Sequence, residues 1–264
     1  MKLFVVLFAT IALFSMMSCQ DDDDDLSDIV NQYACDACDD ITCLDTTECG
    51  PNPDTCNQYQ DYGVLNEDDK QLVLQKQNEL RQKVASGSQE NQPSATNMYE
   101  LIWDDKLANM AQCFANNCQF RHIDCDYAEN PDGFGQNIDE LLTNYKPDHE
   151  DLGYDGDVQD WYDEVEYFPS NLVGGYKDAG NGTYDGGDFG HYTQLVWAKS
   201  KKVGCGSSLF YIEKLKRWHS LLFCNYEPAG NYENEPLYEE GEPASNCENG
   251  PSDDYPGLCK NEKA

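Results

Sequence analysis

The sequence predicts an α+β protein with one main domain that disulfides crosslink. Three segments carry the apolar spacing of amphipathic helices, at about 68–85, 105–117 and 158–168. The stretch 203–226 is rich in strand-forming residues. The chain also has 13 cysteines. Amphipathic helices need a common apolar partner, and we expect a sheet formed by the 203–226 stretch to provide it.

Local sequence features mark the ends of the three helices. Asn66 can cap the first helix, and Gly87 ends it. Pro169 ends the third helix, because proline disfavours helical backbone in the residue before it. The apolar stripe of the second helix consists of Leu107, Met110, Ala111, Phe114, Ala115 and Cys118.

The strand-rich stretch predicts an antiparallel hairpin. If Cys205 lies opposite Cys224, the turn centres on Lys214 and Leu215, and the charged segment EKLKR forms the tip. A polar tip between apolar arms agrees with that register. We therefore expect a disulfide between Cys205 and Cys224.

The cysteines and the N-terminus together indicate secretion. The apolar run LFVVLFATIALFSMM suits the core of a signal peptide, and it is shorter than the about 20 apolar residues that a membrane span needs. Cutting at about residue 19 removes Cys19 and leaves an even number of cysteines, which is typical of a disulfide framework. We divide the chain into a signal peptide (1–19), an acidic, cysteine-rich segment (20–61), a main domain (62–238) and an acidic tail (239–264). In the tail, Cys247 and Cys259 are expected to close a small loop.

The charge excludes one class of partner and leaves another open. With 50 acidic against 17 basic residues, the formal net charge is −33. Such a field opposes binding to nucleic acid and to anionic membranes. It favours solubility, or else loose binding of calcium or of a cationic partner. Two windows fail the EF-hand pattern: the one from Asp151 has Gly153 and Tyr162 at ligand positions, and the one from Asn181 ends in Tyr192.

Two blocks near the end of the main domain resemble the signature segments of the CAP superfamily of cysteine-rich secretory, antigen 5 and pathogenesis-related proteins. They read GHYTQLVWAKSKKVGCG at 190–206 and CNYEPAGN at 224–231. The segments MYELIWDDKLANMAQCFANNCQF, FGQNI and WYDEVEYF precede them in the family order. The resemblance covers about 62–238 and is closest to arthropod venom allergen 5-like proteins. It implies a three-layer α/β/α sandwich with helices on both sides of an antiparallel sheet, a disulfide-rich N-terminal lobe and a short helix at HYTQLVW.

The resemblance also implies some of the other disulfides. The N-terminal lobe should be tied to the end of the second helix, so Cys118 and Cys125 are each expected to bond to an early cysteine, Cys56 and Cys38 respectively. The partners of Cys35, Cys43, Cys49 and Cys113 stay open. Family members that block ion channels have a cysteine-rich C-terminal module, which the two tail cysteines cannot build.

The resemblance further implies a cavity with two histidines and two acids. By motif, these are His122 after CQFR, His191 in GHYTQ and Glu164 in WYDEV. The second acid belongs to a GEN motif, but this chain reads GQN, which gives Gln136. His122, Glu164 and His191 could hold zinc weakly, and an equally good interpretation is a structural hydrogen-bond network. No cofactor is required by either interpretation.

Another departure concerns the first helix. The family commonly has a histidine before the asparagine of HNxxR, where this chain has Gln77 followed by Asn78 and Arg81. We expect Asn78 and Arg81 to brace the sheet through buried hydrogen bonds.

The predicted function is binding without catalysis, with a small lipid, a sterol or a host protein as partner. The segment 168–189 contains Phe168, Tyr176, Tyr184 and Phe189 among glycines, which suits an adaptable lipid wall or a plain connector. Asn181 begins an N-glycosylation sequon in this segment. One alternative is a metal-dependent or serine-type hydrolase using His122, Glu164 and His191, although Thr193 and Ser207 lack an identifiable base. Another alternative is an acidic extracellular calcium-binding protein.

Overall fold

A mixed four-stranded sheet forms the centre of the molecule. The computed structural model describes residues 50–122, 133–178 and 188–261. The strands are β1 (Ile102–Trp103), β2 (Gly135–Thr143), β3 (Lys202–Ile212) and β4 (Arg217–Glu227), in the order β1-β3-β4-β2. The pairs β3–β4 and β4–β2 are antiparallel, whereas β1 runs parallel to β3. The expectation of a purely antiparallel sheet is therefore wrong at the β1 edge.

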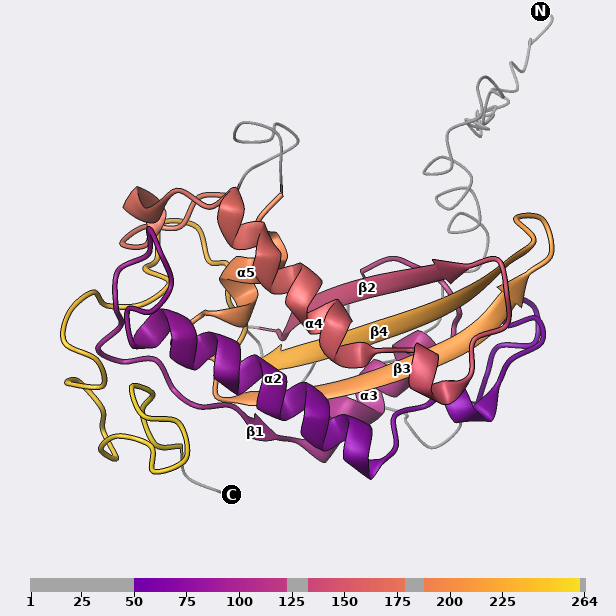
Figure 1. Cartoon of the computed structure of the whole chain (residues 1–264), viewed down its shortest axis with the longest axis horizontal. Helices are drawn as coiled ribbons and strands as arrows, with labels where there is room; N and C mark the ends of the chain where they lie inside the picture. The colour runs from indigo at the N-terminus through magenta and orange to yellow at the C-terminus, as the bar shows by residue number, and fades with distance from the viewer. Residues whose placement is uncertain (1–49, 123–132, 179–187, 262–264) are drawn as a thin grey trace, which may run out of the picture.

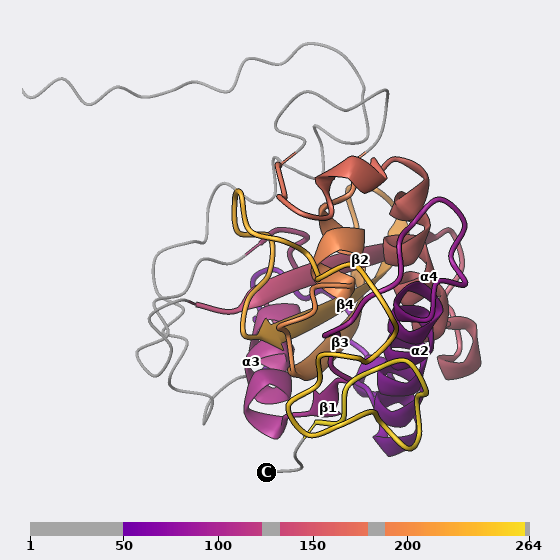
Figure 2. The same ribbon diagram turned by 90° about the vertical axis from the view of Figure 1, so that its left-hand side faces the viewer.

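Helices cover both faces of this sheet, as expected. Helix α3 (Asp105–Ala115) lies against β3 and β4 on one face. Helices α2 (Glu67–Ala85), α4 (Tyr154–Asp163) and α5 (Gly190–Leu195) lie on the other face (Figures 1 and 2). Short 3₁₀ helices connect them at Asp61–Gly63, His149–Asp151, Glu164–Glu166 and Ser170–Leu172. The protein is thus a three-layer α/β/α sandwich.

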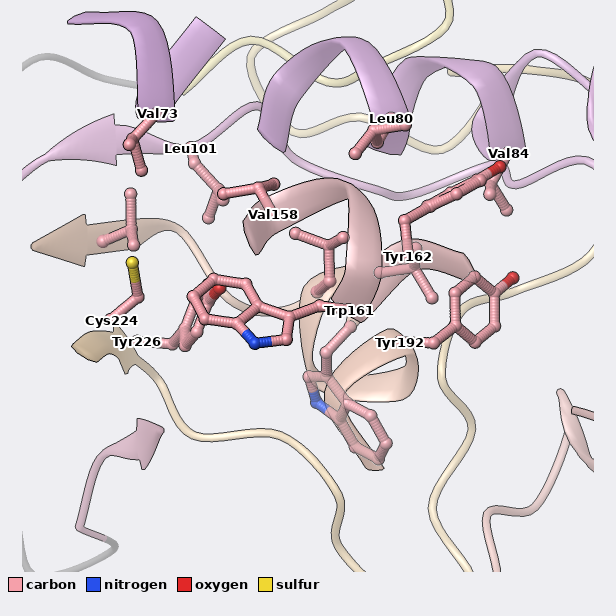
Figure 3. Close-up of a cluster of buried hydrophobic side chains, with 14 of the residues drawn as sticks. Val73, Leu80, Val84, Leu101, Val158, Trp161, Tyr162, Tyr192, Cys224 and Tyr226 are labelled. Carbon is pink, nitrogen blue, oxygen red and sulfur yellow. The ribbon is translucent and has the colours of Figure 1, made fainter. Parts of the chain in front are cut away.

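The larger core lies between the sheet and the layer of α2, α4 and α5. Figure 3 shows Val73, Leu80 and Val84 of α2 facing Val158 and Trp161 of α4. The smaller core lies under α3, where Phe114 packs near Phe223 of β4. The apolar stripes predicted for the helices are therefore the surfaces that they bury against the sheet.

The helix ends depend on caps and glycines. Asn66 caps α2 as predicted, and the carboxylate of Asp69 accepts a hydrogen bond from the Asn66 N–H in return. Helix α3 ends at Ala115, two residues before the expected end. Helix α4 begins at Tyr154 and not at residue 158, because Gly153 adopts the left-handed backbone that precedes it (φ 57°). Helix α4 ends at Asp163, and a 3₁₀ turn continues the segment to Glu166.

The predicted hairpin has the expected register. Cys205 pairs with Cys224, and Ile212 pairs with Arg217 at the last position before the turn. Cys205 and Cys224 form a disulfide within this pair. HYTQLVW begins with α5, the short helix that the family resemblance implies. The sequence did not reveal β2, which extends the sheet beyond β4.

Two other disulfides join distant segments. Cys56 bonds to Cys118 and ties the residues before α2 to the end of α3. Cys247 bonds to Cys259 within the C-terminal segment. Both pairings agree with the expectation from the sequence, and Cys113 is also disulfide-bonded. The expected Cys38–Cys125 pair lies outside the described residues, as do Cys35, Cys43, Cys49, Asn181, Tyr184 and the segment 1–49.

Two polar side chains of α2 brace the backbone of neighbouring segments. The Asn78 amide donates to the Leu101 carbonyl (2.9 Å) and accepts from the Leu101 N–H (2.7 Å). Arg81 is fully buried, and its guanidinium donates to four main-chain carbonyls, those of Tyr99, Leu195, Trp197 and Ser200. Arg81 therefore fixes the segments that lead into β1 and β3 and not the strands themselves, which corrects the expectation for this residue.

The C-terminal segment runs along the β1 side of the molecule. The Cys259 N–H donates to the Met98 carbonyl (2.7 Å), and the Glu100 N–H donates to the Cys259 carbonyl (3.0 Å). Asn261 donates to the Lys201 carbonyl (2.7 Å), next to the start of β3. Among the described residues, no helix is both long and apolar enough to cross a membrane.

Candidate functional site

The four residues implied by the family motifs come from four different segments that meet at one end of the sheet. His122 follows α3, Gln136 is the second residue of β2, Glu164 begins the turn after α4, and His191 lies in the first turn of α5. The ring centres of His122 and His191 are 6.5 Å apart. The fold therefore brings these residues together.

Both carboxylate oxygens of Glu164 form hydrogen bonds with residues at the start of α5. One oxygen lies 2.6 Å from Nδ1 of His191. The other accepts hydrogen bonds from the main-chain N–H groups of His191 (2.9 Å) and Tyr192 (3.0 Å). These N–H groups are among those that a helix start leaves unsatisfied, so a carboxylate is well matched to them. Glu164 thus holds the backbone of α5 and orients the His191 ring.

The protonation of His191 follows from this contact. Burial disfavours the charged imidazolium, but the hydrogen bond and the charge of Glu164 outweigh burial and raise the pKa of His191. Asp139 and Asp188 act in the same direction. The side chains of His191 and Glu164 are only 29% and 17% exposed, so solvent weakens the pair less than it would at an open surface.

His122 and Gln136 form a second, more open chain of hydrogen bonds. Nδ1 of the exposed His122 lies 3.1 Å from Oε1 of Gln136. The Gln136 amide then donates to Oδ1 of Asn225 on β4 (2.9 Å). Gln136 therefore links His122 to Asn225 of β4. Its side chain is neutral and cannot act as a base.

The donor set does not fit a three-ligand zinc site. Within the described residues, no three His, Cys, Asp or Glu side chains are grouped so that they could hold a metal ion. The Glu164 oxygens are bonded to protein N–H groups and to His191, and Gln136 replaces an acid. His122 and His191 remain as the two imidazoles of the set. The expected set of His122, Glu164 and His191 therefore stays a prediction, in which Glu164 orients His191 through both of its oxygens.

The aromatic residues expected to form a lipid wall lie in the core. Phe168, Tyr176 and Phe189 are 4%, 3% and 0% exposed, respectively. The rings of Phe168 and Phe189 pack edge to face with centres 5.3 Å apart, and Tyr176 packs on Trp197 at 6.0 Å. These side chains stabilise the fold and do not line an open groove, so that part of the expectation is wrong for all three.

The two hydroxyls considered as nucleophiles are committed to the backbone. Oγ1 of Thr193 donates to carbonyls of its own helical turn, at Phe189 and Gly190. Oγ of Ser207 donates to the Gly63 carbonyl at 2.7 Å. Both residues are fully buried. Neither hydroxyl is hydrogen-bonded to a histidine.

Sequence reasoning missed two further residues of the site. The Asn137 amide donates to the His191 carbonyl (3.0 Å), which fixes α5 from the side of β2. Asp139 lies two residues further along β2, and burial raises its pKa to about 6. Asn137 stands in the FGQNI segment, so its place beside Gln136 could have indicated it; nothing in the sequence indicates the burial of Asp139.

The fold and the site together define a protein of the CAP class. The family model for "CAP: Cysteine-rich secretory protein family" matches residues 74–212. The chain therefore belongs to the CAP family.

Relatives and solved structures agree with this assignment. Scoloptoxin SSD976 of Scolopendra dehaani is 39% identical over 72% of this chain and 83% of its own length. Venom allergen 5 of Dolichovespula arenaria is 41% identical over 67% of this chain and 83% of its own length. Among solved structures, "Structure of BmVAL-1" matches with a TM-score of 0.63 at 26% identity, covering 75% of this chain and 97% of that one. "Crystal structure of NaASP2 with Zn2+" matches with a TM-score of 0.56 at 26% identity, covering 80% of this chain and 100% of that one.

Proposed function

We propose that this protein is a secreted CAP protein of the venom type that acts by binding an extracellular protein and not by catalysis. The engagement of Glu164 carries the proposal. Its carboxylate makes three hydrogen bonds to the start of α5, including one to His191. A carboxylate used in this way orients the histidine and does not itself accept a proton from a substrate. The hydroxyls of Thr193 and Ser207, which could have served as nucleophiles, donate to main-chain carbonyls and not to this histidine.

Three further observations support the proposal. The disulfides Cys56–Cys118, Cys205–Cys224 and Cys247–Cys259 favour an extracellular setting, because such bonds persist in oxidising compartments. Relatives named as scoloptoxins and venom allergen 5 favour secretion into a venom-like fluid. The burial of Phe168, Tyr176 and Phe189 favours a protein partner over a lipid or sterol.

Zinc is not required for this function. If the ion binds, the imidazoles of His122 and His191 would hold it, and Glu164 would fix the His191 ring through Nδ1, as carboxylates do for metal-bound histidines. Two protein ligands make a weaker site than the three or four of typical zinc proteins. Calorimetry is expected to show no tight zinc binding.

The test compares wild-type protein with His191→Ala in assays for peptide and ester hydrolysis, with and without added zinc. His149→Ala is the matched control, because His149 is also paired with an acid but lies near the start of α2. We expect no turnover that depends on His191. Turnover that His191→Ala abolishes and His149→Ala preserves would establish the hydrolase. Saturable binding of a labelled fatty acid or sterol to delipidated protein would instead identify a lipid-binding function.

A further inference from the structure

Tyr167 is an exposed tyrosine just after the segment that positions Glu164. It follows the 3₁₀ turn Glu164–Glu166 and is 45% exposed. Its hydroxyl has no hydrogen-bond partner among the described residues. Figures 1 and 2 show the end of α4 and the turns after it at the top of the molecule. Other molecules can therefore reach this side chain.

The chain around Tyr167 is strongly acidic. Asp163, Glu164 and Glu166 precede the tyrosine within four residues, and the range 147–176 contains no lysine or arginine. Asp163 and Glu166 are both exposed, and neither forms an ion pair in the described part of the chain. The hydroxyl of Tyr167 is thus presented in a negative electrostatic field.

Burial separates Tyr167 from other tyrosines that stand next to an acid. Four of these are at most 2% exposed, namely Tyr154, Tyr162, Tyr226 and Tyr238. The hydroxyl of Tyr62, which follows Asp61, donates to the Pro147 carbonyl at 3.0 Å. An acidic neighbour alone therefore does not make a tyrosine accessible, and the fold selects among them.

Tyr255 is the strongest competitor, because Asp253 and Asp254 precede it. Its ring packs against the larger core, and burial raises the pKa of its hydroxyl. Nζ of Lys260 lies 2.8 Å from the Asp253 carboxylate and offsets one of the two negative charges. Tyr255 is thus less accessible than Tyr167 and lies in a weaker negative field.

Tyr145 differs from Tyr167 in the opposite way. The two are the exposed tyrosines of the described residues, and Tyr145 is 56% exposed. However, Tyr145 stands between Asn144 and Lys146, so a positive charge adjoins it. Comparing the two residues separates the effect of exposure from that of the neighbouring charge.

From these observations we infer that Tyr167 is a site of tyrosine O-sulfation. The sulfate donor is a nucleoside phosphosulfate, which is an anion, so a sulfotransferase needs a positively charged active-site cleft. Such a cleft attracts an acceptor with acidic neighbours. The phenol oxygen of Tyr167 forms a bond to the donor sulfur, and the bond from that sulfur to the phosphate oxygen breaks. The phenol proton passes to a base of the transferase, and the nucleotide leaves with its phosphate.

The modification would add a fixed negative charge close to the site. The Tyr167 N–H donates to the Glu164 carbonyl at 2.9 Å, and the Glu164 side chain orients His191. A sulfate ester accepts charge-assisted hydrogen bonds from a guanidinium, which can make two at once. The sulfated side chain therefore favours an extracellular partner with an exposed arginine. This inference rests on the proposed function in one respect, namely passage through the secretory pathway, where the donor is available.

The experiment incubates the full-length folded protein with a tyrosylprotein sulfotransferase and a nucleoside phosphosulfate labelled with radioactive sulfur. We expect wild type to incorporate label in the peptide that contains Tyr167. Tyr167→Phe should lose this label, whereas the matched control Tyr145→Phe should incorporate as much as wild type. Both changes remove one hydroxyl from an exposed ring, so the melting temperature should stay that of wild type in each.

A pair of charge variants tests the role of the acids. Asp163→Asn/Glu166→Gln should slow labelling about tenfold, because the field that attracts the acceptor to the cleft is weakened. Glu79→Gln/Glu90→Gln is the matched control, since it removes the same charge from two exposed acids elsewhere. In each pair, one acid accepts a hydrogen bond from the glutamine four residues before it, and the new amide can still accept it. The control should label within about twofold of the wild-type rate.

Three results would overturn the inference. They are no label in wild type, undiminished label in Tyr167→Phe, and equal slowing in the two charge variants, which would show that only net charge matters. Mass spectrometry of protein secreted by animal cells should also find the sulfate ester at Tyr167. A secreted protein without it would overturn the inference and leave the proposed function intact. Hydrolysis that depends on His191 would refute the proposed function without affecting the labelling of Tyr167.

Discussion

Replacing Glu164 by glutamine tests how the site is held together. The change keeps the shape of the side chain and removes its charge. The amide oxygen can still accept from the N–H groups of His191 and Tyr192, but its NH₂ group then faces Nδ1 of His191. That nitrogen must become an acceptor, so the ring has to take the other tautomer.

The magnitude follows from the number of bonds affected. Hydrogen bonds to a charged acceptor contribute about 1.5–3 kcal/mol and neutral ones about 0.5–1.5 kcal/mol. The two main-chain bonds should each weaken by about 1 kcal/mol, and loss of the ion pair adds to this. We expect Glu164→Gln to lower the free energy of unfolding by about 2–3 kcal/mol, and Glu164→Ala to lower it further because no acceptor remains.

The pH dependence has a definite sign. Because the pKa of His191 is raised in the folded protein, its contribution to stability is fully present below the unfolded value of 6.5. It is lost as the pH rises through the higher folded pKa. Glu164→Gln should lower the pKa of His191 and remove this part of the pH dependence.

Urea denaturation measured across pH, with an NMR titration of the histidines, checks both quantities. Glu166→Gln is the matched control, because Glu166 lies in the same 3₁₀ turn but is exposed. The control should change stability by less than about 0.5 kcal/mol. An unchanged pKa of His191 in Glu164→Gln would refute the assigned role of Glu164.

Three other predictions test the fold around the site. Arg81→Lys should lower the free energy of unfolding by about 3 kcal/mol, because one ammonium group cannot replace a planar guanidinium that donates to four carbonyls. An unchanged melting temperature in thermal unfolding would contradict this. Gly206→Ala should destabilise the protein by about 2 kcal/mol or more, because a Cβ there would lie 2.3 Å from the main-chain nitrogen of Gln112 in α3. In the control Gly156→Ala, the added Cβ meets no atom within 4 Å, so this change should be neutral or stabilising. Burial raises the pKa of Asp157 to about 8, so the free energy of unfolding should fall as the pH rises from about 4 to 8. In denaturation experiments, Asp157→Asn should flatten that profile and raise the free energy of unfolding by about 1–2 kcal/mol near pH 8.

The parts of the fold that the sequence predicted are those with strong local causes. Asn66 marks a helix start through its own hydrogen bonds, and the pair Cys205 and Cys224 fixes the hairpin register. Strand β2 was missed because GQNIDELLT has no apolar alternation, since it is an edge strand with acids at its centre. Such a strand is defined by its partner β4 and not by its own pattern.

The site shows a similar division. The motifs placed His122, Gln136, Glu164 and His191 together, because the family pattern fixes which segments meet. They could not show that Glu164 faces the backbone of α5, since that depends on the turn after α4. Nor could they show that the aromatic residues of 168–189 are buried, because a glycine-rich aromatic segment has the same composition in a core as at a surface.

The contact between Asn78 and Leu101 bears on how copies of this protein behave at high concentration. An unpaired strand edge invites another chain to add to the sheet. Next to β1, the Asn78 amide is hydrogen-bonded to the N–H and the carbonyl of Leu101. The C-terminal segment is hydrogen-bonded to the main chain of Met98 and Glu100. These contacts oppose the addition of another strand on this side of the sheet. At the opposite edge, β2 pairs only with β4 among the described residues, and Asp139 and Glu140 stand at its centre. Two such strands would repel each other on approach, so each edge of the sheet resists aggregation by a different means.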